Sequence, residues 1–180
     1  MTTVLYPEAM YPDDVEERRI FGPDVTIIRR DTNALSELTD ADCAEVDGLM
    51  LFRNWAGAAD IARFPKLRAI VRMGVGYDRI DRAAAGRRGI TVCNVPDYGT
   101  TEVADHAISL AVALRRGLLL NHEGQQGPAP SWNTIKDPVI RRFSKQGFGI
   151  VGLGRIGTAV ALRAKALGFH VNFYLSLIHI

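Results

Sequence analysis

The sequence lacks the features that mark disulfide-bonded, metal-bound, membrane-bound or secreted proteins. Its two cysteines, Cys43 and Cys93, are far apart, and it has neither a Cys-x-x-Cys pair nor clustered histidines, which argues against a disulfide framework or a structural zinc site. No apolar stretch approaches the ~18 residues that a membrane-spanning helix needs. The N-terminus has no charged and apolar regions of a signal peptide. We therefore expect a cytoplasmic protein that binds no metal and no membrane.

The charge is balanced and has no long run of one sign. Twenty-two Lys and Arg residues face 20 Asp and Glu residues, for a net charge of +2. This argues against a polybasic tail that binds nucleic acid, and equally against an acidic tail. Over 180 residues, 47% are hydrophobic and 23% are charged, as in a globular chain of one or two small domains.

Short apolar, β-branched runs alternate with helical patterns through the first hundred residues. The predicted strands cover residues 4–6, 25–28, 48–52, 69–71 and 91–93. The predicted helices cover residues 14–20, 40–46, 57–64 and 78–88. This alternation predicts an α/β fold made of βαβ units around a parallel sheet.

The pattern changes after residues 94–99. A long helix is predicted over residues 101–120, with an apolar face broad enough for an interior or for the space between two domains. The composition of residues 124–131 predicts a loop. A strand at about residue 148, a helix over 158–167 and a strand over 170–174 follow, with Gly168 at a left-handed helix C-cap.

A glycine-rich turn joins that strand to that helix. Its residues are Gly152, Leu153, Gly154, Arg155, Ile156 and Gly157, a G-x-G-x-x-G pattern. The pattern alone is weak, but a strand before it and a helix and second strand after it favour dinucleotide binding. The glycines would allow a tight turn, a close approach of pyrophosphate and close helix–strand packing, and the helix N-terminus would attract the phosphates. The alternative is a turn whose small residues serve packing alone.

The end of the chain departs from the dinucleotide-binding pattern. An acidic residue for the adenosine ribose is expected about 20 residues past the glycines, yet no Asp or Glu occurs from Pro138 to Ile180. Further strands of such a fold are also absent. Residues 175–180 resemble a translated sequencing adaptor, and we expect them to be a non-native tail; the alternative is a genuine extension of the last strand.

Three stretches together resemble the D-isomer-specific 2-hydroxyacid dehydrogenases. They are residues 71–81, residues 92–107 and the glycine-rich turn, in the order and at the separation typical of that family. Arg72, residues 93–96 and residues 159–169 are most similar to the branch that resembles C-terminal-binding proteins. The resemblance covers nearly all of residues 46–174.

The resemblance implies two domains and an activity. Residues 1–98 would form a flavodoxin-like substrate domain, and residues 99–174 the start of a Rossmann NAD-binding domain, including the helix that crosses between domains and forms a homodimer in relatives. Relatives transfer hydride between NAD and a 2-hydroxy or 2-keto acid. Their catalytic Arg, Glu and His lie later in the nucleotide domain, so no catalytic residue is assigned here. We expect the chain to be a C-terminally truncated fragment that is inactive by itself.

The resemblance also implies a substrate-binding loop. Gly74, Val75 and Gly76 follow a strand, where backbone N–H groups can form a concavity for a carboxylate, and Val75 would also touch the nicotinamide. Arg72 could add a charge-assisted hydrogen bond. The alternatives are an ordinary turn and an arginine that reaches solvent. Thr101 is a candidate cofactor contact, or simply the cap of its helix.

Other candidate residues have simpler interpretations. Asp105 and His106 are adjacent, but neighbouring residues of a helix do not face each other, so we expect them in solvent or an interface. Cys93 is expected to be a small buried hydrophobe. The competing functions are an NAD(H)-sensing protein or corepressor of the C-terminal-binding-protein type and, less favoured, a methyltransferase.

Overall fold

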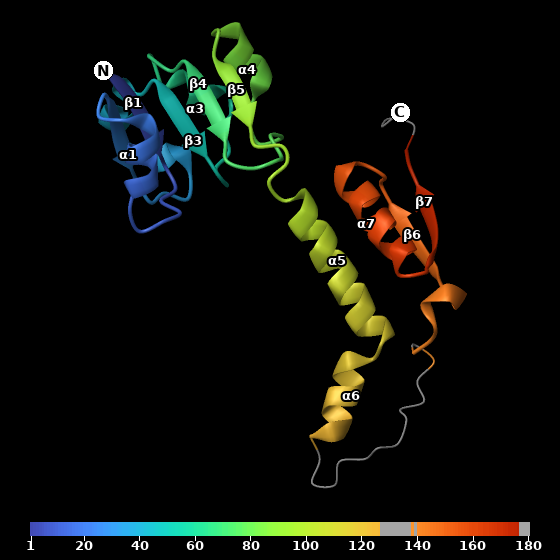
Figure 1. Ribbon diagram of the computed structural model, residues 1–180. Helices are drawn as coiled ribbons and strands as arrows, with labels where there is room; N and C mark the ends of the chain where they lie inside the picture. Colours follow the sequence, from blue (N-terminus) through green and yellow to red (C-terminus); the bar gives the residue numbers. More distant parts are fainter. Residues whose placement is uncertain (127–137, 139, 177–180) are drawn as a thin grey trace. The chain divides into compact units, whose positions relative to one another are not determined.

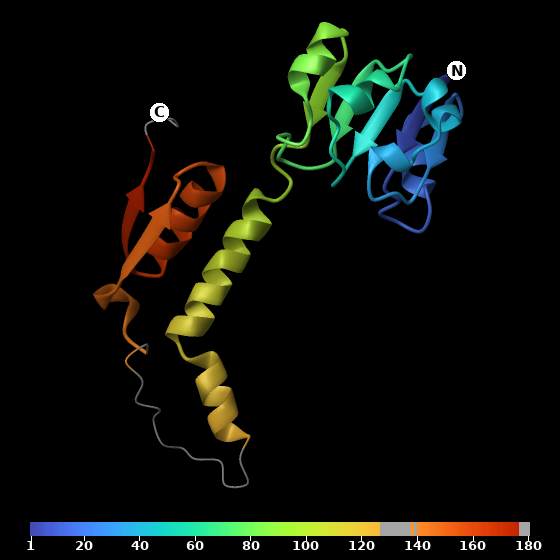
Figure 2. The same cartoon turned by 180° about the vertical axis from the view of Figure 1, so that it is seen from behind.

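The computed structural model describes residues 1–126, 138 and 140–176, which form two compact units (Figures 1 and 2). The first unit is Met1–Asp97 and the second is Tyr98–Ile180. Residues 127–131 of the predicted loop and residues 177–180 of the predicted tail lie outside the described residues.

The first unit is a parallel five-stranded sheet with helical connections. The strand order is β2-β1-β3-β4-β5, which is the flavodoxin-like order. The strands are β1 (Thr2–Tyr6), β2 (Val25–Arg29), β3 (Gly48–Leu51), β4 (Ala69–Arg72) and β5 (Thr91–Asn94). The helices are α1 (Val15–Phe21), α2 (Asp40–Ala44), α3 (Ala58–Ala62), α4 (Arg82–Arg87) and the 3-10 turn η1 (Leu35–Glu37). The predicted α/β class with a parallel sheet is confirmed.

The core of this unit lies on one face of the sheet. Alternate strand residues, Leu5, Leu49 and Ile70 among them, pack against helix residues such as Ile61 and Phe64. Cys93, predicted to be buried, is exposed, so that prediction is wrong. Its neighbour Val92 packs against the core, and because successive residues of a strand point to opposite faces, Cys93 of the edge strand β5 points away from it.

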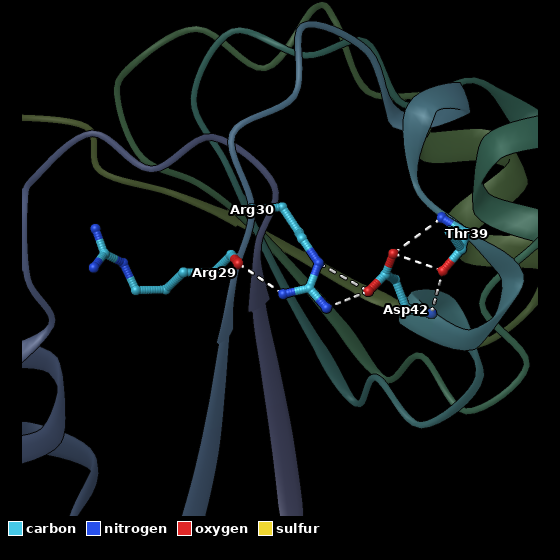
Figure 3. A network of polar contacts seen from close by, with 4 residues as sticks. All are labelled: Arg29, Arg30, Thr39 and Asp42. Atoms are coloured by element: carbon cyan, nitrogen blue, oxygen red, sulfur yellow. Dashed lines mark hydrogen bonds and ion pairs between the residues drawn. The ribbon is translucent and has the colours of Figure 1, made fainter.

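A polar network fixes the start of α2 (Figure 3). Thr39 Oγ1 accepts a hydrogen bond from Asp42 N at 3.1 Å, and the Asp42 carboxylate accepts one from Thr39 N at 3.0 Å, which is a capping box. Arg30 Nε donates to the same carboxylate at 2.9 Å. The Thr39 hydroxyl and N–H, followed by Arg30, hold the pKa of Asp42 below its ordinary value.

We expect this network to make stability depend on acid. Because the Asp42 pKa is depressed in the folded chain, its stabilisation is complete above the unfolded pKa of about 3.9 and disappears as the pH falls through the folded pKa. Asp42→Ala should therefore lower the free energy of unfolding by about 1 kcal/mol at pH 7 and by less at about pH 3. Urea unfolding of both chains at the two pH values measures this. An equal difference at both would contradict it.

The second unit combines a pair of parallel strands with three α-helices. The elements are α5 (Thr100–Arg115), α6 (Leu118–Gln125), the 3-10 turn η2 (Phe143–Lys145), β6 (Gly147–Val151), α7 (Arg155–Ala166) and β7 (His170–Tyr174). Strands β6 and β7 pair from Gly147↔His170 to Val151↔Tyr174. Helix α5 packs on α7 around Ala104, Ile150 and Val160. None of the helices in the described part of the chain is long and apolar enough to cross a bilayer.

The long helix predicted over residues 101–120 is broken at Gly117. This residue has φ +61°, a left-handed conformation that favours glycine, and a Cβ added there would also lie 2.6 Å from Ile140 Cδ1. Helix α6 then runs to Gln125, which corrects the loop predicted from residue 124. Gly168 has φ +92° directly after the end of α7, which confirms its predicted left-handed conformation.

Candidate functional site

The predicted substrate loop directly follows β4 in the first unit. Arg72 ends the strand, and its guanidinium folds back onto the loop: a Cβ added at Gly74 would overlap it. Only glycine at position 74 lets the guanidinium lie so close to the backbone. The structure therefore brings together Arg72 and the loop Gly74–Gly76, which we predicted as substrate-binding residues.

The end of β5 holds this loop from one side. Val95 N donates to Gly74 O at 3.0 Å, and Asn94 Nδ2 donates to Val75 O at 2.8 Å. At the start of the loop, Met73 N donates to Leu51 O at 2.7 Å. Asn94 lies within residues 92–107, which carry the family resemblance, but the sequence alone assigned it no role, because only the folded backbone shows which carbonyl its amide reaches.

Arginine guanidiniums lie over aromatic rings that follow β3. The Arg53 and Arg72 guanidinium carbons lie 5.1 and 5.6 Å from the centroid of the Phe52 ring, and that of Arg79 lies 5.8 Å from the Trp55 ring. Within the described residues, none of these three arginines forms an ion pair with a carboxylate. Arg79 Nη1 donates a hydrogen bond to Arg53 O at 2.6 Å, so this guanidinium is held by the backbone and not by a carboxylate.

A cavity of about 480 Å³ opens next to these rings. It is lined by residues that include Glu8, Phe52, Arg53, Trp55 and Arg79. The Glu8 carboxylate accepts hydrogen bonds from the N–H groups of Phe52 and Arg53, both at 2.7 Å, and so fixes the backbone after β3. Sequence reasoning did not single out Glu8, Arg53 or Trp55, since these residue types are common on surfaces.

The glycine-rich turn lies in the second unit between β6 and α7. Gly152 has φ +90°, and its N–H donates to Tyr174 O at 2.8 Å, which fixes the turn against β7. Gly154 is the N-cap of α7, and a Cβ added there would meet nothing within 4 Å. At Gly157 an added Cβ would overlap the carbonyl oxygen of Gly152. Gly152 thus allows the tight turn, Gly154 leaves the space beside the helix N-terminus open, and Gly157 allows the helix to pack closely on the turn.

This turn suits a phosphate group. The first turn of α7 has no acidic residue, so the helix dipole and the N–H groups at its start face solvent without a competing carboxylate. Strand β7 ends at Tyr174, and neither Leu175 nor Ser176 after it is acidic. These residues fit the pyrophosphate of a dinucleotide. None of them is an acidic residue that could bind the adenosine ribose.

Three other candidates are placed by α5. Thr101 is its second residue; Gly99 is the N-cap, and no side chain caps this end, so the capping role considered for Thr101 is wrong. Asp105 pairs with Arg163 of α7 at 2.5 Å, and His106 is exposed, so the two do not form an acid/base pair. The described residues also contain no group of His, Cys, Asp and Glu suited to a metal ion.

Residues 9–172 match the catalytic domain of the D-isomer specific 2-hydroxyacid dehydrogenases. The chain is 39% identical over 120 residues to glyoxylate/hydroxypyruvate reductase A HPR2 of Arabidopsis thaliana, covering 66% of this chain and 37% of the relative. It is 35% identical over 162 residues to D-3-phosphoglycerate dehydrogenase of Mycobacterium leprae, covering 90% of this chain and 28% of the relative. The chain thus spans about a third of the curated relatives it matches.

Two solved structures have a similar fold. The NADPH-dependent glyoxylate/hydroxypyruvate reductase of Sinorhizobium meliloti, in complex with citrate, has a TM-score of 0.78 at 29% identity, covering 96% of this chain and 54% of that one. The D-lactate dehydrogenase of Aquifex aeolicus, complexed with NAD and lactic acid, has a TM-score of 0.78 at 21% identity, covering 97% and 51%, and shows the fold alone.

Proposed function

The chain belongs to the D-isomer specific 2-hydroxyacid dehydrogenase family, and from this premise we propose that it is part of an NAD-dependent oxidoreductase that interconverts a 2-hydroxy acid and a 2-keto acid. The observation that carries the proposal is the Arg72 guanidinium, which lies against Gly74 at the start of the Gly74–Gly76 loop. A flexible cation and a row of backbone N–H groups at the carboxyl end of a parallel strand are suited to a small carboxylate.

The proposed cofactor site is the Gly152–Gly157 turn. Its glycine backbone and the start of α7 would hold the pyrophosphate, with Leu153, Arg155 and Ile156 beside it and Thr101 as a further contact. The bound nicotinamide supplies the hydride donor or acceptor of the reaction. We propose NAD on the strength of the family resemblance. Titration with NADH and with NADPH in parallel tests this preference, and tighter binding of NADPH would overturn it.

In the proposed substrate site, Arg72 and the N–H groups of Val75 and Gly76 orient the carboxylate. These groups bind charge and fix position, and neither moves a proton. We propose no acid/base residue within this chain. Orientation by several donors is what makes a small acid reactive toward a cofactor held at a fixed place.

A sensing or corepressor role is the less favoured alternative, since both curated relatives described above are named as enzymes. The branch that resembles C-terminal-binding proteins stays a prediction. We further propose a homodimer formed through α5, because Val103, Leu110 and Leu114 of this helix are exposed apolar residues. Sedimentation velocity of the chain tests this proposal.

Arg72→Ala tests the substrate site. We expect oxalate, a small dianion that resembles a 2-keto acid, to bind about tenfold to a hundredfold more weakly, because a charge-assisted hydrogen bond contributes about 1.5–3 kcal/mol. Affinity for NADH should not change. Arg68→Ala, which removes the same charge just before the amino end of β4, is the matched control. Equal oxalate affinity in all three chains would show that Arg72 does not bind the carboxylate.

A further inference from the structure

Two consecutive carbonyl groups of the substrate loop, those of Gly74 and Val75, both point toward the end of β5. Gly74 O accepts from Val95 N at 3.0 Å, and Val75 O accepts from Asn94 Nδ2 at 2.8 Å. Both donors come from the end of β5, the strand beside β4. The first bond uses only backbone and would form with any residue except proline at position 95. The second depends on one side chain.

The direction of the carbonyls fixes the direction of the N–H groups. In a planar trans peptide the C=O and N–H point to opposite sides. The Gly74 carbonyl belongs to the same peptide as the Val75 N–H, and the Val75 carbonyl to the same peptide as the Gly76 N–H. With both carbonyls held toward β5, both N–H groups point away from it. Neither N–H donates a hydrogen bond to a group among residues 1–126, 138 and 140–176.

We infer that Asn94 is a positioning residue: its side-chain amide holds the Val75 carbonyl so that the Val75 and Gly76 N–H groups face outward together as a carboxylate-binding pair. This inference rests on the proposed function and adds to it the residue that sets the loop's geometry. Two convergent N–H groups form a concavity that binds anions.

The side chain at position 94 is suited to this role for two reasons. Asn94 ends β5 in register with Arg72, so the same pair of strand ends supplies the cation and the tether. Its side chain is half-buried, and the amide is a neutral donor, so it holds the carbonyl without repelling or competing for the bound acid. Without it the peptide between Val75 and Gly76 is free to rotate, and one N–H of the pair leaves the site.

Amide-resolved NMR titration of the 180-residue chain with oxalate tests the inference. In the parent chain the Val75 and Gly76 amide resonances should shift in a saturable way. Asn94→Leu, which keeps the size but removes the donor, should weaken binding about tenfold. Asn94→Ser, whose side chain is too short to reach the carbonyl, should weaken oxalate binding equally. This variant tests the role of the Asn94 amide if the leucine variant does not fold. Asn94→Gln keeps an amide and should recover most of the affinity.

Two controls separate positioning from general destabilisation. Asn172→Leu makes the same exchange on an exposed residue of β7 and should leave oxalate binding unchanged. The thermal midpoint and the NADH affinity of each variant should stay at the parent's values. If the Asn94 variants bind oxalate as tightly as the parent chain, the inference is wrong while the proposed function stands. If oxalate shifts neither amide in the parent chain, both are wrong.

Discussion

A chain that carries Gly157→Ala is expected to lose the ordered structure of its second unit while the first unit remains folded. The added methyl group would overlap the Gly152 carbonyl oxygen and lie 3.1 Å from its carbon. Both atoms are backbone of the turn, so no side-chain rotation relieves the clash. Overpacking of this kind costs about 3 kcal/mol, and a unit with only two strands has little stability to lose.

Hydrogen exchange measured by mass spectrometry resolves the two units. Peptides from α7 should lose their protection in Gly157→Ala, while peptides from β3 and β4 should keep theirs. Gly154→Ala is the matched control, because a Cβ at that position meets nothing within 4 Å. Unchanged protection of α7 in Gly157→Ala would contradict the close packing of helix and turn.

Gly154→Val is expected to have the opposite effect, with the fold kept and cofactor binding lost. Gly154 has φ −80°, which every residue adopts readily, and the space around an added Cβ is open. A branched side chain there occupies the space through which a pyrophosphate would approach the start of α7. The loss of one charge-assisted hydrogen bond to the phosphates alone predicts about tenfold to a hundredfold weaker binding of NADH.

Fluorescence titration with NADH measures this loss, and circular dichroism shows whether the helices persist. Gly149→Ala is the matched control, since it changes a glycine of β6 that also has open space around it but lies before the turn. Equal affinity of Gly154→Val and the parent chain for NADH would show that the turn serves packing alone.

The regular elements were predictable because local signals and tertiary packing agree. Four of the five predicted strands of the first unit match the observed ones to within a residue, and β1 begins two residues before its predicted start. β-Branched apolar runs are suited to the strands of a sheet. The helix that follows the glycine-rich turn begins at Arg155, three residues before the predicted start, because Gly154 is its N-cap and the last residues of the glycine-rich pattern already belong to its first turn.

The remaining differences come from contacts between distant residues. Gly117 interrupts an apolar pattern that continues on both sides, and its left-handed conformation and its closeness to Ile140 are visible only in the folded chain. Cys93 is exposed because β5 is an edge strand, which composition does not reveal. The same limit applies to the candidate site. The sequence predicted Arg72 and the glycines from their pattern, whereas the tether from Asn94 depends on the register of β4 and β5.

The measurement that tests the central claim most directly is an amide-resolved titration of the chain with NADH, repeated with Gly154→Val. A dinucleotide-binding turn predicts saturable shifts of the amides at positions 152–157 in the parent chain and greatly reduced shifts in the variant. Amides of this turn that do not respond to millimolar NADH, or that respond equally in both chains, would contradict the assignment of a nicotinamide-dependent dehydrogenase.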